Sequence, residues 1–133
     1  MIDVKDLKVG NWVHDGQVSQ FPMFITSVRD DGYLTLNFHG NEGMDWESES
    51  KQIEGIPLND DVLLKMGFGK CNASWEHFNN DVVVKLCNSG WLSIEVYKHG
   101  MMFRRCTCNS VRYVHELQNI YQAISQKELK VIL

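Results

Sequence analysis

The sequence predicts an α+β fold: an SH3-like, mostly antiparallel β half, a short linking helix, and a β-meander packed by one long C-terminal helix. Short runs of alternating apolar and polar residues, separated by Gly, Asn and Asp, fill most of the 133 residues. One stretch, residues 109–124, instead has a sustained helical period. The halves are expected to span residues 1–58 and 59–133, either as two small domains or as one compact domain with a shared core.

The first half is expected to contain about five short strands, close to the number that a small barrel needs. Asp30-Asp31-Gly32 is a hairpin signal, after which Leu34 and Leu36 point inward and Asn37 outward. Apolar residues in the second strand are out of phase, which predicts a bulge. The expected strands begin at Trp12-Val13 and continue with residues 21–29, 33–38, 44–46 and 53–58, the last an edge strand because it contains Pro57.

The second half is expected to begin with a short helix over residues 62–66, capped by Asn59 and ended by Gly67. Turn residues then separate four runs with strand character, which predicts an antiparallel meander. These runs are residues 73–78, 82–87, 91–98 and 101–108.

The long helix is expected to start at Asn109 or Ser110, whose side chains can cap the first turn. Its apolar stripe consists of Val111, Val114, Leu117, Tyr121 and Ile124. Such a stripe needs a sheet to cover, so we expect Leu117 to be buried against the aliphatic side of the strand at 91–98. Residues 129–133 are expected to add an edge strand.

Composition predicts an ordered, cytoplasmic protein. Hydrophobic residues make up 44% of the chain and charged residues 23%, which is typical of globular domains. No apolar run approaches the length of a membrane span, and the acidic first residues do not resemble a signal peptide. The net charge of −4 is uneven: residues 1–66 hold 12 acids and 5 bases (−7), and residues 67–133 hold 5 acids and 8 bases (+3). The halves are expected to attract each other or to meet different partners.

The four cysteines are expected to be free thiols, because a reducing compartment disfavours disulfides. Cys106 and Cys108 share one face of a strand and are the candidate metal ligands, together with Cys71, Cys87, His99 or His115. Structural zinc sites usually pair their ligands as C-x2-4-C, and this spacing is absent. We therefore expect no metal and no cofactor.

The sequence contains no standard catalytic motif, which disfavours an enzyme. His115 and Glu116 could serve acid–base chemistry, but nothing places a nucleophile beside them. An acidic loop formed by Glu42, Asp45, Glu47 and Glu49 could hold calcium, but it lacks the residue order of a formed calcium loop. A small hydrolase or metal protein is the third functional hypothesis.

A mixture of cations and aromatic rings in the second half is the candidate binding surface. It consists of Lys98, Arg104, Arg105, Arg112, Trp91 and Tyr97. Arg104 and Arg105 are adjacent in a strand, so one must face the helix and the other solvent or a partner. The buried one is expected to pair with Glu95 or Glu116. The alternative interpretation is that these residues have no binding role, and that they occupy ordinary strand edges and form cross-strand aromatic pairs.

Three blocks of the chain resemble a group of small uncharacterised proteins from Bacteroidetes genomes, often from phage-like or mobile regions. These blocks are residues 7–13, residues 53–58 with 64–68, and residues 113–121 with Leu129. The resemblance implies an accessory protein of a mobile element, and it supplies no catalytic or binding residues.

The functional hypothesis from the sequence is a non-enzymatic module that binds a protein partner. The alternative is an accessory protein that binds single-stranded nucleic acid, and a membrane is not expected to be a partner.

Overall fold

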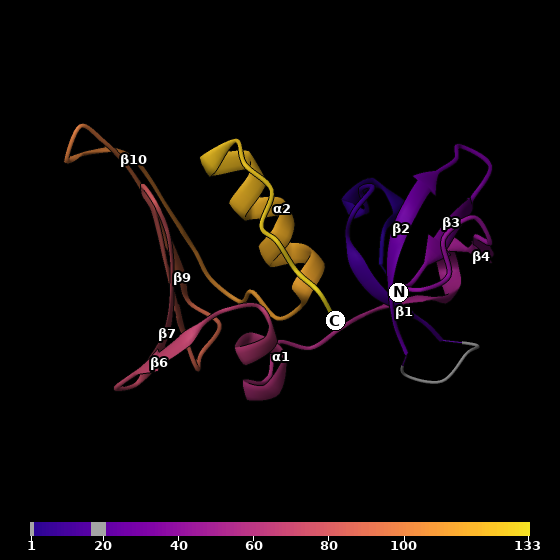
Figure 1. Cartoon of the computed structure of the whole chain (residues 1–133), viewed down its shortest axis with the longest axis horizontal. Coiled ribbons are helices and arrows are strands. Elements are labelled where there is room, and N and C mark those ends of the chain that lie inside the picture. The colour runs from indigo at the N-terminus through magenta and orange to yellow at the C-terminus, as the bar shows by residue number, and fades with distance from the viewer. Residues whose placement is uncertain (1, 17–20) are drawn as a thin grey trace. The chain divides into compact units, whose positions relative to one another are not determined.

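The computed structural model describes residues 2–16 and 21–133, and it confirms an α+β protein with two antiparallel sheets and two α-helices (Figure 1). The described chain divides into two compact units. The first comprises the residues up to Pro57, with 113–116 and Leu133, and the second comprises 58–112 and 117–132. No helix in the described ranges is long and apolar enough to cross a membrane.

The first unit is built on the five strands that the sequence predicted. They are β1 (Trp12–Asp15), β2 (Pro22–Val28), β3 (Tyr33–Asn37), β4 (Trp46–Glu49) and β5 (Ile53–Gly55), in the spatial order β4-β3-β2-β1-β5. Short 3-10 helices, η1 (Val4–Asp6) and η2 (Ser50–Gln52), precede β1 and β5. Over the described residues the sheet is open, with β4 and β5 at its edges, so the closure of a barrel is not observed.

The core of the first unit follows the predicted alternation. Its buried side chains are Leu7, Val13, Met23, Ile25, Leu34, Leu36 and Ile53. The predicted bulge is confirmed, because the β2–β3 register shifts between Ile25 and Ser27. Asn37 was expected to face solvent but is buried. Its amide nitrogen donates to Asp45, and its oxygen accepts from the Asn41 amide, each at 2.9 Å, and these bonds satisfy the buried amide.

Two predicted boundaries in the first unit are wrong. The acidic stretch after Trp46 is not a loop, because Glu47 and Glu49 lie in β4 and pair with β3. The strand β5 ends at Gly55, two residues before Pro57, which instead forms an isolated bridge with Tyr113. The Tyr113 ring packs on Gly55 so closely that a Cβ there would lie 2.6 Å from it.

The second unit begins with α1 (Asp60–Lys65), which Asn59 caps by accepting a hydrogen bond from the Val62 N–H at 2.9 Å. Five strands then form a continuous antiparallel meander in the order β10-β9-β8-β7-β6. They are β6 (Gly69–Cys71), β7 (Ser74–Asn79), β8 (Val82–Cys87), β9 (Leu92–Lys98) and β10 (Met101–Cys108). The sequence predicted the last four and missed β6, whose three residues show no apolar alternation.

The long helix α2 (Val114–Ser125) starts four to five residues later than the sequence predicted. Ser110 cannot begin it because its φ is +62°, outside the helical region. Glu116 defines the start instead, since its carboxylate accepts a hydrogen bond from the Tyr113 N–H at 3.0 Å. Within the second unit α2 runs along one side of the sheet (Figure 1), and Leu117 is fully buried, as predicted.

Residues 129–133 do not form the predicted edge strand. Leu129 and Val131 are nevertheless buried, and Lys130 and Ile132 are exposed. The alternation that suggested a strand therefore reflects burial of every second side chain without backbone pairing.

Candidate functional site

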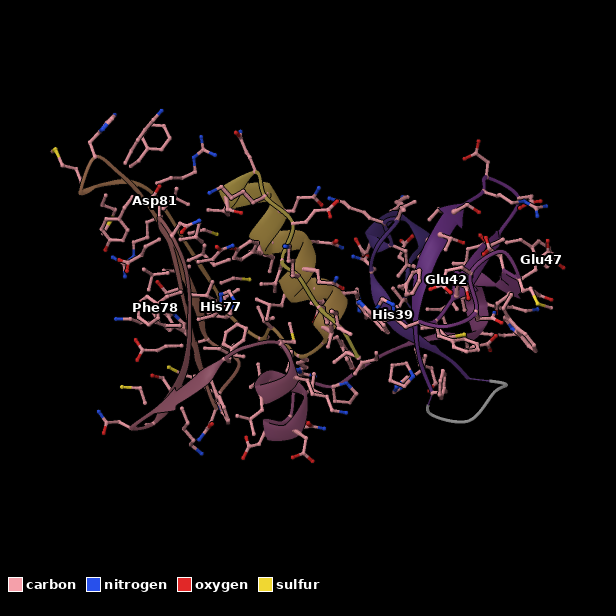
Figure 2. The ribbon with its side chains drawn as sticks, in the orientation of Figure 1. His39, Glu42, Glu47, His77, Phe78 and Asp81 are labelled. Carbon is pink, nitrogen blue, oxygen red and sulfur yellow. The ribbon has the colours of Figure 1, made fainter. Side chains whose placement is uncertain are left out.

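The two sides of the second sheet have different chemistry. Register places Cys106 beside Ile94 and Arg104 beside Val96 on the side that α2 covers. We call the opposite side the outer face. It carries Arg105, directly opposite Glu95, and Phe78, which is 67% exposed. Figure 2 shows Phe78 and its neighbour His77 pointing to opposite sides of the sheet.

Arg104 and Arg105 diverge as expected. Arg104 is the half-buried one, and its Nη1 donates to the Ile124 carbonyl at the end of α2, at 3.1 Å. The expected carboxylate partner was wrong for Arg104, because Glu116 caps the helix and Glu95 lies on the outer face. A carbonyl at a helix C-terminus carries partial negative charge, so it can pair with a guanidinium.

The turn between β9 and β10 carries an exposed apolar cluster. Met101, Met102 and Phe103 are 73%, 50% and 56% exposed. Lys98 Nζ lies over the Phe103 ring, 4.9 Å from its centroid, and the Arg104 guanidinium lies 5.3 Å from it. We call Lys98, Met101, Met102 and Phe103 the tip cluster. Figure 1 shows this turn extending past the ends of the neighbouring strands.

The six candidate surface residues do not form one surface. Lys98 and Tyr97 lie at the tip end of β9, and Trp91 precedes its other end, roughly 20 Å away at the rise of an extended strand. The Tyr97 hydroxyl donates to Glu95 at 3.4 Å. Arg112 is exposed and follows Val111, whose N–H bonds to Gly90 beside Trp91. A nucleic-acid strand would therefore meet two separate groups.

The outer face is also not a basic stripe. Glu76 and Lys85 form an ion pair across β7 and β8 at 4.0 Å, and Glu95 opposes Arg105 across β9 and β10. Carboxylates and bases alternate on this face, so it offers little net attraction to phosphate.

The cysteines do not gather into a metal site. All four are free thiols, with Cys106 and Cys108 half-buried on the α2 side of β10. The structure brings no three His, Cys, Asp or Glu residues of its described part together in a way that could hold a metal ion. A hydrogen bond to Glu76 raises the pKa of the Cys71 thiol, which lowers its nucleophilicity at neutral pH.

His77 is half-buried and His115 is buried, and both lie against aromatic rings. Burial lowers the pKa of His77, which packs between the rings of Phe68 and Tyr121, with centroids 5.0 and 6.4 Å away. Burial also lowers the pKa of His115, which stacks on Tyr113 at 5.8 Å. The Nδ1 atoms of both histidines lack a hydrogen-bond partner. Both side chains therefore pack as rings against their aromatic neighbours.

The acids of the first unit act separately. Arg29 pairs with Asp31 and with Glu47, the latter at 2.9 Å. Hydrogen bonds from its own backbone and from Gly40 lower the pKa of Glu42. Figure 2 shows Glu42 and Glu47 in the first unit. Asp45 accepts hydrogen bonds from Thr26 and Asn37, and Glu49 pairs with Lys51. The described carboxylates of this unit therefore have separate partners and are not grouped as calcium ligands would be.

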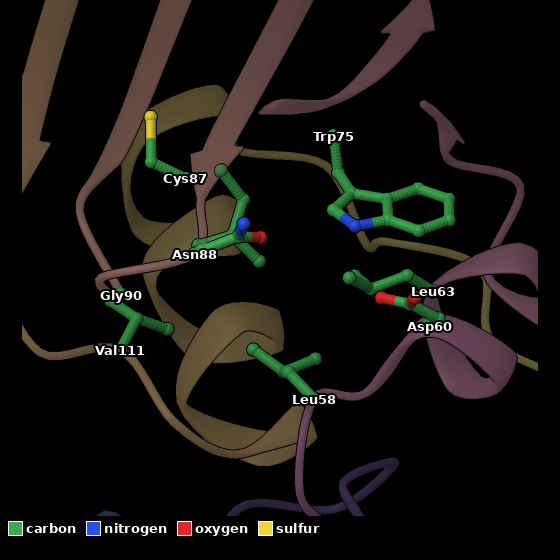
Figure 3. A pocket seen from close by; sticks show the side chains of 9 residues that line it. Leu58, Asp60, Leu63, Trp75, Cys87, Asn88, Gly90 and Val111 are labelled. Atoms are coloured by element: carbon green, nitrogen blue, oxygen red, sulfur yellow. The ribbon is translucent and has the colours of Figure 1, made fainter. Parts of the chain in front are cut away.

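A small recess in the second unit was not predicted. Figure 3 shows Trp75 from β7, Asp60 from the first turn of α1, and Asn88 from the β8–β9 turn around it. Its volume is about 100 Å³. Gly90 lets the chain after β10 form a wall, because a Cβ there would lie 3.1 Å from the Val111 carbonyl oxygen. We call this site the Trp75 recess.

From the sequence, the residues that line the Trp75 recess could be recognised only as parts of a helix cap and of a turn. Asn59-Asp60-Asp61 predicted a helix cap, and Asn88-Ser89-Gly90 predicted a turn. Nothing in either segment indicated that both would meet Trp75. Comparison with known protein families, with curated proteins and with solved structures finds no match.

Proposed function

We propose that this protein is a non-enzymatic interaction module that uses the tip cluster to bind a partner protein with an apolar recess bordered by carboxylates. The proposal includes a role as an accessory protein of a mobile element and an SH3-like relationship for the five-stranded first unit. Its main support is the exposure of three consecutive large apolar side chains, Met101, Met102 and Phe103, at the end of a hairpin. Clustered apolar exposure of this kind marks interaction sites.

The charges beside the tip cluster indicate the chemistry of the partner. Lys98 is exposed and its Nζ lies over the Phe103 ring, whereas Arg104 bonds to a helix carbonyl and Arg105 opposes Glu95. A partner surface with a carboxylate beside an apolar centre would complement Lys98 and the apolar side chains next to it. Methionine side chains adapt to irregular surfaces, which suits a contact formed by a narrow hairpin.

Binding of single-stranded nucleic acid is the second candidate. The observation in its favour is an exposed phenylalanine with two cations over its ring, because bases stack on rings and phosphates pair with cations. Two observations weigh against it. Arg104 is engaged by the Ile124 carbonyl, and Arg105 opposes Glu95.

Affinity capture with matched variants tests the proposed function. The parent chain, Met102→Ser/Phe103→Ser, and the outer-face control Phe78→Ser would each be used as bait in extracts of a Bacteroidetes host. We expect the parent and the control to retain the same protein and the tip variant to lose it. Equal recovery by all three baits would refute the tip cluster as the binding site.

Fluorescence anisotropy with a labelled single-stranded oligonucleotide tests the second candidate. Binding at low salt that weakens with added salt would support it, provided that Arg104→Ala/Arg105→Ala lowers the log–log slope by roughly 0.7 for each phosphate interaction that it removes. No binding at about 100 μM protein, above the usual range of nonspecific affinities, would remove this candidate.

A further inference from the structure

The Trp75 recess has the size of a site for a small chemical group. Its volume of about 100 Å³ exceeds the space that one water needs, roughly 10–15 Å³ on a comparable measure. Trp75 is 4% exposed and forms the interior, and the exposed Asp60 and Asn88 lie at the rim. Leu63, Leu86 and Val111 supply apolar walls. The recess can therefore take a group of several heavy atoms with both polar and apolar parts.

The Trp75 indole nitrogen is a donor without a protein partner. Its N–H forms no hydrogen bond with the part of the chain that the structure describes. Figure 3 shows the nitrogen on the side of the ring that faces the recess. The nitrogen is not one of the buried polar atoms that lack a partner, so it is open to the recess, where water or an acceptor atom of a ligand can reach it. The interior of the recess is thus prepared for a ligand with an acceptor atom.

Whereas the interior of the recess requires a hydrogen-bond acceptor from the ligand, the rim requires a donor. Asp60 makes no ion pair or hydrogen bond with the described side chains, and Figure 3 shows its carboxylate oxygens directed toward the recess. An ionised carboxylate only accepts hydrogen bonds, so it needs a donor. Asn88 can both donate and accept and is compatible with either group. A complementary ligand carries an acceptor and a donor side by side.

We propose that the Trp75 recess binds a primary carboxamide. The amide oxygen accepts from Trp75 Nε1, the amide NH₂ donates to the Asp60 carboxylate, and the attached carbon atoms contact Leu63 and Val111. A carboxylate ligand would meet repulsion from Asp60, and a purely cationic group would leave the Trp75 N–H unpaired. The same chemistry is offered by a free small amide and by a glutamine or asparagine side chain of a partner.

Titration followed by ¹⁵N–¹H NMR tests this proposal on the full chain. The chain contains four tryptophans, and Trp75→Phe identifies the Trp75 indole signal. Three ligands of equal size would be compared: isobutyramide, isobutyrate and isobutyramidinium. We expect isobutyramide to shift the Trp75 signal saturably, with a Kd of order 1–100 mM for so small a ligand, and the other two to bind at least threefold more weakly.

Matched variants locate the binding group. Asp60→Ala should weaken isobutyramide binding at least threefold, and Asp61→Ala, a neighbouring acid of the same helix turn outside the recess, should leave it unchanged. The tip variant Met102→Ser/Phe103→Ser should also leave it unchanged, so this test is independent of the proposed function. No saturable shift, tighter binding of isobutyramidinium or isobutyrate, or equal effects of the two aspartate variants would overturn the proposal.

A final titration distinguishes a free small amide from the side-chain amide of a partner protein. Acetyl-Gly-Gln-Gly-N-methylamide and its glutamate counterpart would be titrated in the same way. Binding of the glutamine peptide at least tenfold tighter than isobutyramide would identify a partner's side chain as the ligand, whereas equal or weaker binding would identify a free small amide. Preference for the glutamate peptide would contradict the proposal.

Discussion

The two sides of the second sheet belong to the same strands and yet differ in burial and in the charges they carry. On the side that faces α2, Val84 and Ile94 are fully buried, and Arg104 is held by a helix carbonyl. On the outer face, Phe78 and Arg105 are exposed, and acids alternate with bases. Because neighbouring residues in a strand point to opposite sides, stability and surface chemistry can be changed separately in this sheet.

The largest expected difference between the sides is in stability. Leu117 lies at the centre of the apolar stripe of α2 and is fully buried, so Leu117→Ala should lower the free energy of unfolding by about 2–5 kcal/mol. Phe78→Ala on the outer face should change it by about 0.5 kcal/mol or less. Urea melts would measure both. Superimposable melts of Leu117→Ala and the parent would show that α2 does not cover the sheet.

A smaller difference is expected between the turns at the two ends of β9. Gly90 and Gly100 both have positive φ, +85° and +78°. A Cβ at Gly90 would lie 3.1 Å from the Val111 carbonyl oxygen, whereas a Cβ at Gly100 would have no described atom within 4 Å. Gly100→Ala should therefore cost about 1 kcal/mol for the backbone alone, and Gly90→Ala about 1 kcal/mol more.

Thermal and urea melts of the two glycine variants test this difference directly. Equal destabilisation would mean that the chain at Val111 moves away at no cost, and that the wall of the Trp75 recess is soft.

A still smaller effect is expected from pH on the α2 side. Burial lowers the folded-state pKa of His77 below its ordinary value of 6.5, so the unfolded chain binds the proton more readily. Stability should fall as pH drops below about 6.5, until the folded-state pKa is passed. In the first unit, burial also lowers the pKa of His14 and of His115, so both act in the same direction. His77→Gln should flatten part of this slope in urea melts between pH 7 and 5, and an unchanged slope would show that His77 is already solvated.

Local signals in the sequence predicted those parts of the fold that depend on neighbouring residues. The hairpin at Asp30–Gly32, the Asn59 cap and the bulge after Ile25 each follow from turn residues or from alternation within one strand. The predicted start of α2 was wrong for two reasons. Ser110 has a side chain that can cap a helix, but its positive φ is not compatible with a helix start, and the Glu116 carboxylate caps the first turn further along the chain. Residues 129–133 alternate as a strand would, but no neighbouring strand pairs with them within the described chain.

The candidate sites differ in how far the sequence could predict them. The sequence could place Lys98 and Arg105 near each other because they lie within one hairpin, where adjacency in sequence implies adjacency in space. The strand register shows that Arg104 faces α2, so this residue is not part of the exposed surface. The Trp75 recess was missed because Asp60, Trp75 and Asn88 come from three elements whose meeting depends on the tertiary fold. Gly90 is the one residue whose type reflects the close approach of the chain at the recess, and in the sequence it predicted only an ordinary turn.

We propose that the tip cluster, and not the outer face, meets the partner. A photoreactive phenylalanine analogue placed at Phe103 or at Phe78 tests it most directly, because both side chains are exposed, at 56% and 67%, in the same sheet. We predict that, in cell extract, the analogue at position 103 crosslinks one discrete protein, that added salt lowers the yield, and that position 78 gives no such product. Equal crosslinking from both positions, or a product from position 78 alone, would contradict the account.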